Sequence, residues 1–343
     1  MIENGYLKWL SSTTSRWWCD SAVVGEVEAA IENGATGVTT NPLLICRSLY
    51  GNPEYWKPFL EGVDVLSGDE RAEEIIKRVT IPIAELLLDI YGKSEKEQGF
   101  VCAQVNPSFA GDRDSMLKMA KRLHGWAPNI AIKLPATAAG LDVIEECAAL
   151  GLTTVGTVSF TAAQAVAVAL RQHRGALSAE RSGITPAAAF SVIMVGRLDD
   201  YLRDLAMDQQ APVEAGDILW AGTAAIKNAY KAISQAGLKS KLMPAGMRGA
   251  YHATELAGAD MNMSIASGIQ SELQKERYPY EINIGNEIPA DVLARLKTMP
   301  EFIRSYEPDG MTPGDFISFG ATQKTLSQFV EAGWQRIKEY YYG

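Results

Sequence analysis

The sequence predicts a single (β/α)8 barrel, and two observations support this fold class. Eight short apolar runs are spread over about the first 265 residues, and helical patterns lie between them. Most of these runs carry apolar residues at successive positions, which is typical of parallel strands buried on both faces. Eight strands with intervening helices favour a closed barrel, and a doubly wound open sheet is the alternative.

The strands follow from the apolar runs in chain order. We expect them at residues 16–19, 37–40, 100–105, 130–134, 153–158, 190–195, 241–245 and 261–265. No GxGxxG follows the first run, and GxxxxGK[ST] is found nowhere in the chain. Both absences weaken the nucleotide-binding version of the open sheet, because that version needs a glycine-rich loop around phosphate.

Helical patterns fill the intervals between the strands. We expect two helices in 51–91, one with an entry loop in 106–126, and one or two in 213–236. Apolar residues at helical spacing predict a further helix over 141–148. The alanine-rich run 162–170 predicts another, with Thr161 as its N-cap.

The chain continues well beyond the last strand. The proline-rich stretch 272–313 predicts a loop-rich excursion, whose aromatic residues favour core packing over an interface or a lid. Residues 323–341 place Leu326, Phe329, Val330, Trp334 and Ile337 on one side of a terminal amphipathic helix. We expect residues 1–343 to form one barrel domain, with strands over about 16–265 and the excursion and helix in 270–343.

Composition limits the function classes. The net charge is −9, so the chain is a poor general binder of nucleic acid or of anionic membranes. It has no basic segment followed by an apolar run at its start, and no apolar run of about 18 residues. The four cysteines are far apart, which favours free thiols. These features predict a cytoplasmic protein without a membrane or nucleic-acid partner, and the three scattered histidines argue against a metal site.

Polar residues at strand ends are the candidate functional residues, because a barrel of this type forms its site at the carboxyl ends of its strands. In chain order they are Asp20, Thr39, Thr40, Asn41, Gln104, Lys133, Thr157, Arg197 and Arg248.

Lys133 lies inside the apolar run NIAIKLPATAAG. Strand alternation places Ile132 and Leu134 on one face and Lys133 on the other, so Lys133 points into the barrel if its neighbours face the helices. Burial favours the neutral amine, a nucleophile that forms a Schiff base with a ketone and so makes or breaks carbon–carbon bonds. The alternative is a structural lysine that reaches solvent or pairs with Asp20.

Other strand-end residues suit the same chemistry. Asp20 is a candidate for the proton transfers that a Schiff-base reaction needs. Arg197 and Arg248 follow the sixth and seventh strands, where barrels often bind phosphate, and Gly246 allows close approach of the backbone. The alternative for Arg197 is a surface ion pair with Asp199 or Asp200.

Together these residues resemble the transaldolase family, including its fructose-6-phosphate aldolase branch. CDS followed by GATGVTTNPLLI is similar to the first two strands of the family. NIAIKLPATAAGLDVIEECAALGLTT is similar to its lysine strand and the helix that follows. MVGRLDD and PAGMRGAYHATELAGAD are similar to its phosphate-side segments. The resemblance spans at least residues 18–264.

The resemblance implies a (β/α)8 barrel, with Lys133 as the Schiff-base lysine and Asp20 as the acid/base group. It implies that Thr157 and Gln104 handle the catalytic water and that Asn41, with Thr40 beside it, contacts the substrate. Arg197 and Arg248 match the phosphate-binding cations, with Gly246 between them in the same site. Sugar phosphates are the implied partners, a homo-oligomer is usual, and neither a metal nor an organic cofactor is implied.

The sequence departs from the family pattern at four positions. Gln104 stands where transaldolases proper usually carry glutamate, and Val155 begins VGT where they read NVT. Met194 stands where the aldolase branch has a tyrosine, and Gly246 replaces a serine that helps to hold phosphate. Gln104 favours the aldolase branch, whereas Met194, whose thioether cannot transfer a proton, favours transaldolase chemistry.

We therefore expect a transaldolase that moves a dihydroxyacetone unit from a ketose phosphate such as fructose 6-phosphate to an aldose phosphate through Lys133. The first alternative is an aldolase that releases dihydroxyacetone. A barrel that binds a sugar phosphate without turning it over is the second alternative, and a Schiff-base aldolase for another substrate is the third.

Overall fold

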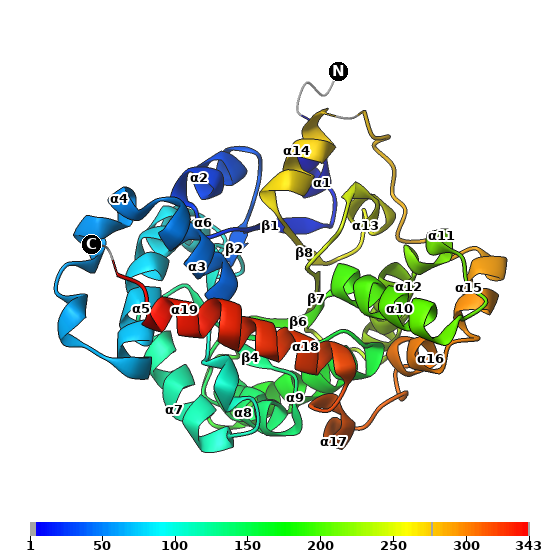
Figure 1. Ribbon diagram of the computed structural model, residues 1–343. Helices are drawn as coiled ribbons and strands as arrows, with labels where there is room; N and C mark the ends of the chain where they lie inside the picture. The colour runs from blue at the N-terminus through cyan, green and yellow to red at the C-terminus, as the bar shows by residue number, and fades with distance from the viewer. Residues whose placement is uncertain (1–4, 276, 342–343) are drawn as a thin grey trace.

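The computed structural model describes residues 5–275 and 277–341. They form a parallel barrel of eight strands and the helices around it (Figure 1). The strands are β1 (Arg16–Asp20), β2 (Gly37–Thr39), β3 (Phe100–Gln104), β4 (Ile130–Pro135), β5 (Thr154–Thr157), β6 (Ala189–Ile193), β7 (Lys241–Pro244) and β8 (Asn262–Ile265). Their order is β7-β6-β5-β4-β3-β2-β1-β8. A parallel bridge between Leu242 and Met261 joins the two edges, so the sheet closes and the predicted fold class is confirmed.

The interior of the barrel is filled by aromatic rings. Trp18 from β1 lies 4.9 Å from Phe190 of β6 between ring centroids, and Phe100 of β3 lies 5.8 Å from Phe190. These strands are not neighbours in the sheet, so their side chains meet only across the barrel axis. All three rings are buried, so they form a packed layer that fills the barrel below the carboxyl ends of the strands.

Helices cover the outside of the barrel and its amino end. In the first half of the chain they are α1 (Gly5–Ser12), α2 (Val24–Glu32), α3 (Pro42–Gly51), α4 (Pro53–Trp56), α5 (Gly68–Leu86), α6 (Leu88–Lys93), α7 (Arg113–His124) and α8 (Ala138–Ala149). In the second half they are α9 (Ala162–Arg181), α10 (Val195–Gln209), α11 (Ala215–Ile218), α12 (Ala221–Gln235), α13 (Ala250–Glu255) and α14 (Ser267–Lys275). Short 3-10 turns are η1 (Lys57–Leu60), η2 (Val63–Val65) and η3 (Pro107–Phe109).

The excursion after the last strand is more helical than the sequence predicts. Residues 277–289 contain no helix or strand, as expected. The helices α15 (Ala290–Leu296), α16 (Pro300–Tyr306) and α17 (Pro313–Phe316) then follow. The expectation of a loop over 272–313 is therefore wrong for most of its second half. Phe302 and Leu296 are buried there, which confirms core packing for this part.

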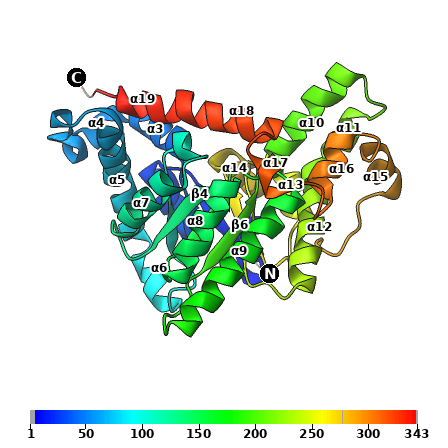
Figure 2. The same ribbon diagram turned by 90° about the horizontal axis from the view of Figure 1, so that it is seen from below.

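The terminal helical segment crosses the mouth of the barrel (Figures 1 and 2). It comprises α18 (Gly320–Gln328), the π-helical turn η4 (Phe329–Trp334) and α19 (Gln335–Lys338). Phe329, Trp334 and Ile337 are buried, as the amphipathic pattern predicts. This segment brings the end of the chain to the carboxyl ends of the strands. Within the described residues, no helix combines the length and apolarity needed to cross a membrane.

Candidate active site

A cavity of about 450 Å³ opens at the carboxyl ends of the strands, beneath the terminal helix. Strand ends, the loops that follow them, and the helices α3, α10 and α18 supply its walls. The candidate residues that line it are Asp20, Asn41, Lys133, Thr157, Arg197, Gly246 and Arg248. The structure thus brings together six of the nine polar strand-end candidates and Gly246, drawn from six different strands or their loops.

Strand alternation explains which side chains enter the cavity. Trp18 faces the barrel axis, so Asp20, two residues later, faces the same way near the mouth. Lys133 on β4 is in register with Gln104 on the neighbouring β3, which places both side chains on the interior face. Thr40 has the opposite parity from Thr39, and its hydroxyl donates to the Cys102 carbonyl at 2.6 Å. The Thr40 side chain therefore does not line the cavity.

Lys133 is buried, with only 6% of the residue exposed, yet it lines the cavity. Its Nζ donates to the main-chain carbonyl of Thr40 at 3.2 Å. Among the described residues, no carboxylate lies within ion-pair distance of this nitrogen. The amine thus has one hydrogen bond, to a neutral carbonyl, on a side chain that lines the cavity, an arrangement that suits a nucleophile.

Asp20 is held by a chain of hydroxyl groups. The Thr39 Oγ1 donates to Asp20 Oδ1 at 2.8 Å, and Ser264 Oγ lies 2.6 Å from the same threonine oxygen. Since the threonine proton points to Asp20, Ser264 is the donor in the second bond. The chain fixes the carboxylate beside the cavity and leaves its other oxygen without a hydrogen bond from the described residues.

Thr157 and Gln104 flank Lys133 from β5 and β3. Thr157 lines the cavity and is almost fully buried. Gln104 is buried below the lining, and its Oε1 has no hydrogen-bond partner within the described part of the chain. A buried amide oxygen without a partner is costly, so a bound water or substrate hydroxyl is its expected partner.

Asn41 serves two purposes at the start of α3. Its Oδ1 accepts hydrogen bonds from the main-chain N–H groups of Leu43 and Leu44, at 2.9 and 3.0 Å, as an N-cap does. Pro42 at the first helical position has no N–H to satisfy. The cap fixes the Asn41 side chain at the cavity wall, and its amide NH2 group remains available to a substrate hydroxyl.

Arg197 is positioned by the terminal helix. Its guanidinium donates to Gln328 Oε1 at 2.6 Å and to Thr325 Oγ1 at 3.4 Å, and it lies 5.4 Å from the Phe329 ring centroid. Burial, and then the positive charge of Arg248, lower the pKa of Arg197. It makes no ion pair within the described residues, so the alternative of a surface ion pair with Asp199 or Asp200 is wrong. Its fixed charge is directed at the cavity.

Arg248 is held as a rigid fork. Its Nε donates to Asp200 Oδ2 at 2.8 Å, and a terminal nitrogen forms an ion pair with the same oxygen at 2.7 Å. The other terminal nitrogen donates to the Gly246 carbonyl at 2.8 Å. Gly246 has φ +58°, a left-handed conformation that glycine adopts without strain. Burial raises the pKa of Asp200, but the contacts with Arg248 and Arg203 outweigh burial and leave this pKa lowered.

A buried network supports the loop that carries Arg248. His252 Nδ1 accepts from the Arg248 main-chain N–H at 3.3 Å, and its Nε2 lies 3.0 Å from Asp199 Oδ2. Asp199 Oδ1 accepts from the Gly222 N–H at 2.7 Å. Asp199 therefore stabilises the loop that carries Arg248 and does not line the cavity.

Several lining residues were not predicted from the sequence. Ser264 from β8, Arg47 from α3, and Lys324 and Gln328 from α18 all line the cavity. Ser264 had a signal, since it lies at the carboxyl end of an expected strand. The other three lie on helices, and only the path of the terminal helix over the mouth brings two of them there. The described residues contain no cluster of three or more side chains able to hold a metal ion.

The fold and the cavity define a (β/α)8-barrel enzyme with a buried lysine and an arginine pair at the carboxyl ends of its strands. A comparison with known families matches residues 17–305 to the family described as Transaldolase/Fructose-6-phosphate aldolase. The chain belongs to this family, and it is an enzyme of the transaldolase type.

Known relatives agree with this assignment. The chain is 27% identical to "Probable transaldolase 2" of Listeria monocytogenes over 254 residues, which cover 74% of this chain and 85% of the relative. It is 29% identical to "Transaldolase" of Thiobacillus denitrificans over 209 residues, covering 57% of this chain and 55% of that protein. It is 32% identical to "Probable transaldolase" of Halalkalibacterium halodurans over 190 residues, covering 55% of this chain and 65% of that protein.

Proposed function

We propose that this enzyme transfers a dihydroxyacetone unit from a ketose phosphate, such as fructose 6-phosphate, to an aldose phosphate through a Schiff base on Lys133. The observation that carries the proposal is the position of Lys133 in the cavity, where its amine has one neutral contact and shares the space with Asp20 and two arginines. A binding protein has no need of a buried lysine in this position.

The reaction starts with attack of Lys133 Nζ on the ketose C2 carbonyl. The carbinolamine loses water and leaves an iminium ion. Removal of the C4 hydroxyl proton breaks the C3–C4 bond, and the electron pair moves to the iminium nitrogen. An aldose phosphate then leaves, and a three-carbon enamine remains on Lys133. Asp20 is the group that we assign to the C4 hydroxyl proton, since its carboxylate is fixed at the cavity wall.

The remaining residues have binding roles in this proposal. Asn41 contacts a substrate hydroxyl, and Arg197 and Arg248 bind the phosphate with their guanidinium groups. Thr157 and Gln104 hold the water that is lost and regained at C2, because Gln104 Oε1 is a buried acceptor without a partner in the described chain. In the second half-reaction the enamine carbon attacks the acceptor aldehyde, and the first steps run in reverse.

A second candidate is an aldolase that releases free dihydroxyacetone, and Gln104 favours it. In that reaction the enamine carbon takes up a proton, and water hydrolyses the resulting three-carbon iminium ion before an acceptor arrives. Met194 argues for transfer, because it lines the cavity and its thioether supplies no proton for hydrolysis. Both reactions pass through the same enamine. They differ in whether this enamine attacks an acceptor aldehyde or is released as dihydroxyacetone.

Product analysis separates the candidates. The enzyme is incubated with fructose 6-phosphate with and without erythrose 4-phosphate, and glyceraldehyde 3-phosphate and free dihydroxyacetone are quantified. Transfer predicts glyceraldehyde 3-phosphate only when the acceptor is present, and little dihydroxyacetone. Acceptor-independent release of dihydroxyacetone indicates the aldolase. No product with a folded protein would leave the sugar-phosphate binder or a Schiff-base aldolase for another substrate.

A further inference from the structure

The cavity contains more positive charge than its carboxylates neutralise. Besides Lys133, four basic side chains line it: Arg47, Arg197, Arg248 and Lys324. Arg248 is paired with Asp200 at 2.7 Å, and Lys324 with Asp204 at 2.8 Å. Within the described residues, Arg47 and Arg197 have no carboxylate within ion-pair distance. Two unpaired guanidinium groups therefore share one cavity.

Arg47 is the less constrained of the two. It lies on α3, the helix that Asn41 caps, and its side chain is exposed. No hydrogen bond or ion pair holds its guanidinium among the residues that the structure describes. Its charge acts on Arg197, whose pKa is lowered by burial, then by Arg248, and also by Arg47. Asp20 and Asp200 act in the opposite direction. Arg47, Arg197 and Arg248 thus line one cavity, and an anion bound there would relieve the repulsion that Arg197 experiences from the other two.

We propose that Arg47 is a third cationic ligand for the substrate phosphate and sets the preference of this enzyme for phosphorylated sugars over uncharged ones. This inference rests on the proposed function, whose phosphate site it extends. A phosphate monoester has three free oxygens, so it can accept from a third guanidinium in addition to Arg197 and Arg248, whereas a carboxylate has two oxygens. Arg47 reaches the site from α3, opposite the strand-six and strand-seven loops.

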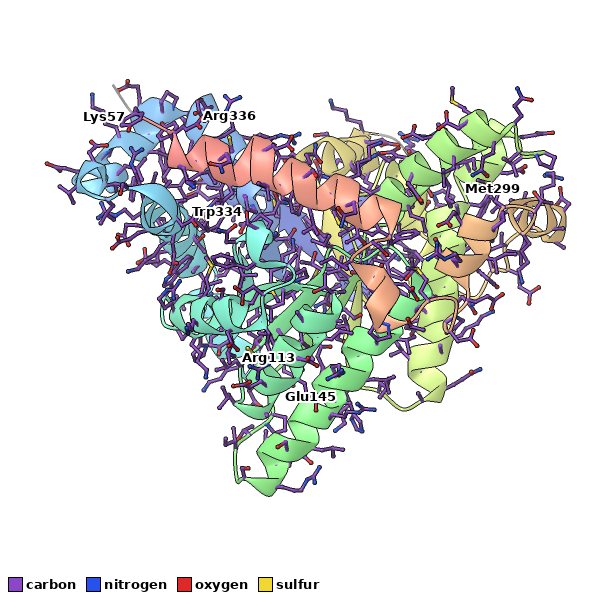
Figure 3. The ribbon with its side chains drawn as sticks, turned by 60° about the horizontal axis from the view of Figure 1, so that its bottom comes forward. Lys57, Arg113, Glu145, Met299, Trp334 and Arg336 are labelled. Atoms are coloured by element: carbon purple, nitrogen blue, oxygen red, sulfur yellow. The ribbon has the colours of Figure 1, made fainter. Side chains whose placement is uncertain are left out.

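The competing interpretation is that Arg47 is a solvated surface cation that only adds to the local potential. Arg336 provides a matched control for this effect. It lies on α19 near α3, since it acts with Arg47 on the pKa of Cys46. Its guanidinium lies 4.8 Å from the Tyr50 ring centroid, and it is not part of the cavity lining. Figure 3 shows Arg336 on the opposite side of the terminal helix from Trp334.

Binding of inorganic phosphate tests the ligand role without catalysis. Isothermal titration is performed on the wild-type protein and on Arg47→Gln, Arg47→Lys and Arg336→Gln. Loss of one charge-assisted contact predicts a Kd about tenfold weaker for Arg47→Gln. Arg47→Lys should recover part of the affinity, and Arg336→Gln should bind as the wild type does. Equal weakening by Arg47→Gln and Arg336→Gln, or no binding by the wild type, would overturn the proposal.

Acceptor kinetics test the specificity role. The value of kcat/KM is measured with erythrose 4-phosphate and with erythrose at a fixed fructose 6-phosphate concentration. Arg47→Gln should lower it about tenfold for the phosphorylated acceptor and leave it nearly unchanged for erythrose. An equal effect on both acceptors contradicts the proposal. If the wild type forms no product, the proposed reaction fails, and the phosphate titration alone still decides the role of Arg47.

Discussion

At the scale of single residues, burial does not by itself identify a reactive lysine. Lys133 and Lys227 are equally buried, each 6% exposed. Lys227 Nζ donates to the main-chain carbonyls of Asn283 and Asn286 and lies 3.6 Å from a Glu255 oxygen, away from the cavity. Lys133 has one carbonyl contact and faces the cavity. The two lysines differ in that Lys133 lines the cavity and has fewer hydrogen-bond partners than Lys227.

Asp20 has the clearest single-residue prediction. Asp20→Asn keeps the shape of the side chain and removes its capacity to accept the C4 hydroxyl proton. We expect kcat to fall about 10²–10⁴-fold, with a small change in KM, in steady-state kinetics. Asp260→Asn is the control, since Asp260 pairs with Lys241 at an exposed site and does not line the cavity. Comparable kcat values for both variants would contradict the role of Asp20.

Thr39 is a positioning residue in this account. Thr39→Val removes the hydroxyl that donates to Asp20 Oδ1, while the β-branched shape stays. We expect kcat to fall about tenfold with little change in KM, because one hydrogen bond that orients the carboxylate is lost. Thr39→Ser keeps the hydroxyl and should restore most of kcat.

Thr36→Val is the control for this substitution. Among the residues that the structure describes, the Thr36 hydroxyl bonds only to the Trp17 carbonyl, at 3.4 Å, and Thr36 lies outside the cavity lining. The kcat of the Thr36→Val variant should therefore stay near the wild-type value. Failure of Thr39→Ser to recover activity would show that the methyl group, and not the hydroxyl, is what the site needs at this position.

At the scale of elements, the strands were predictable and the helices over the cavity were not. All eight strands lie within two residues of their expected ends, because each is a short apolar run between polar turns. Strand parity then places Asp20, Lys133 and Thr157 inward, but not Thr40. Local sequence could not show that α18 would reach Arg197, since that contact joins residues more than a hundred positions apart.

The close packing of the terminal helix on α3 can be tested at Gly333. A Cβ atom there would lie 2.8 Å from Pro42 Cβ and 3.0 Å from the Leu43 main-chain nitrogen, so Gly333→Ala forces the two helices apart. We expect the free energy of unfolding in urea to fall by about 1–3 kcal/mol. The KM for the ketose phosphate should also rise, because Asn41 caps α3.

Gly92 offers the matched control. It lies in α6, and a Cβ atom there would meet nothing within 4 Å. Gly92→Ala should leave the protein as stable as the wild type or stabilise it by up to about 1 kcal/mol. If both alanine variants had the same free energy of unfolding, the contact between η4 and α3 would not be the constraint that the structure indicates.

At the scale of the whole molecule, the cavity depends on both ends of the chain. Asp20 comes from the first strand, and Lys324 and Gln328 come from the terminal helix across the mouth. Sugar-phosphate substrates fit the family to which the chain belongs. The sequence motifs predicted that Asp20 and Lys133 share one site, and the cavity lining agrees. The path of the last helix over the mouth of the barrel had to be seen in the structure.

The same global packing predicts inert thiols. Cys19, Cys46, Cys102 and Cys147 are all buried and free. Burial raises the pKa of Cys102 to about 11 and those of Cys19 and Cys147 to about 12. Thiolate forms only as pH approaches these values, so a disulfide reagent at pH 8 should modify no cysteine in the folded protein and all four in denaturant. Rapid modification of the folded protein would contradict this packing.

The most direct test of the central claim is reductive trapping of the Schiff base. The enzyme is incubated with fructose 6-phosphate, treated with sodium borohydride, digested, and mapped by mass spectrometry. We expect a stable adduct on Lys133 with the mass of a reduced dihydroxyacetone or hexose phosphate unit and no adduct on Lys227. The Lys133→Ala variant should form no adduct and should be inactive. An active enzyme without an adduct on Lys133, or a Lys133→Ala variant with full activity, would contradict it.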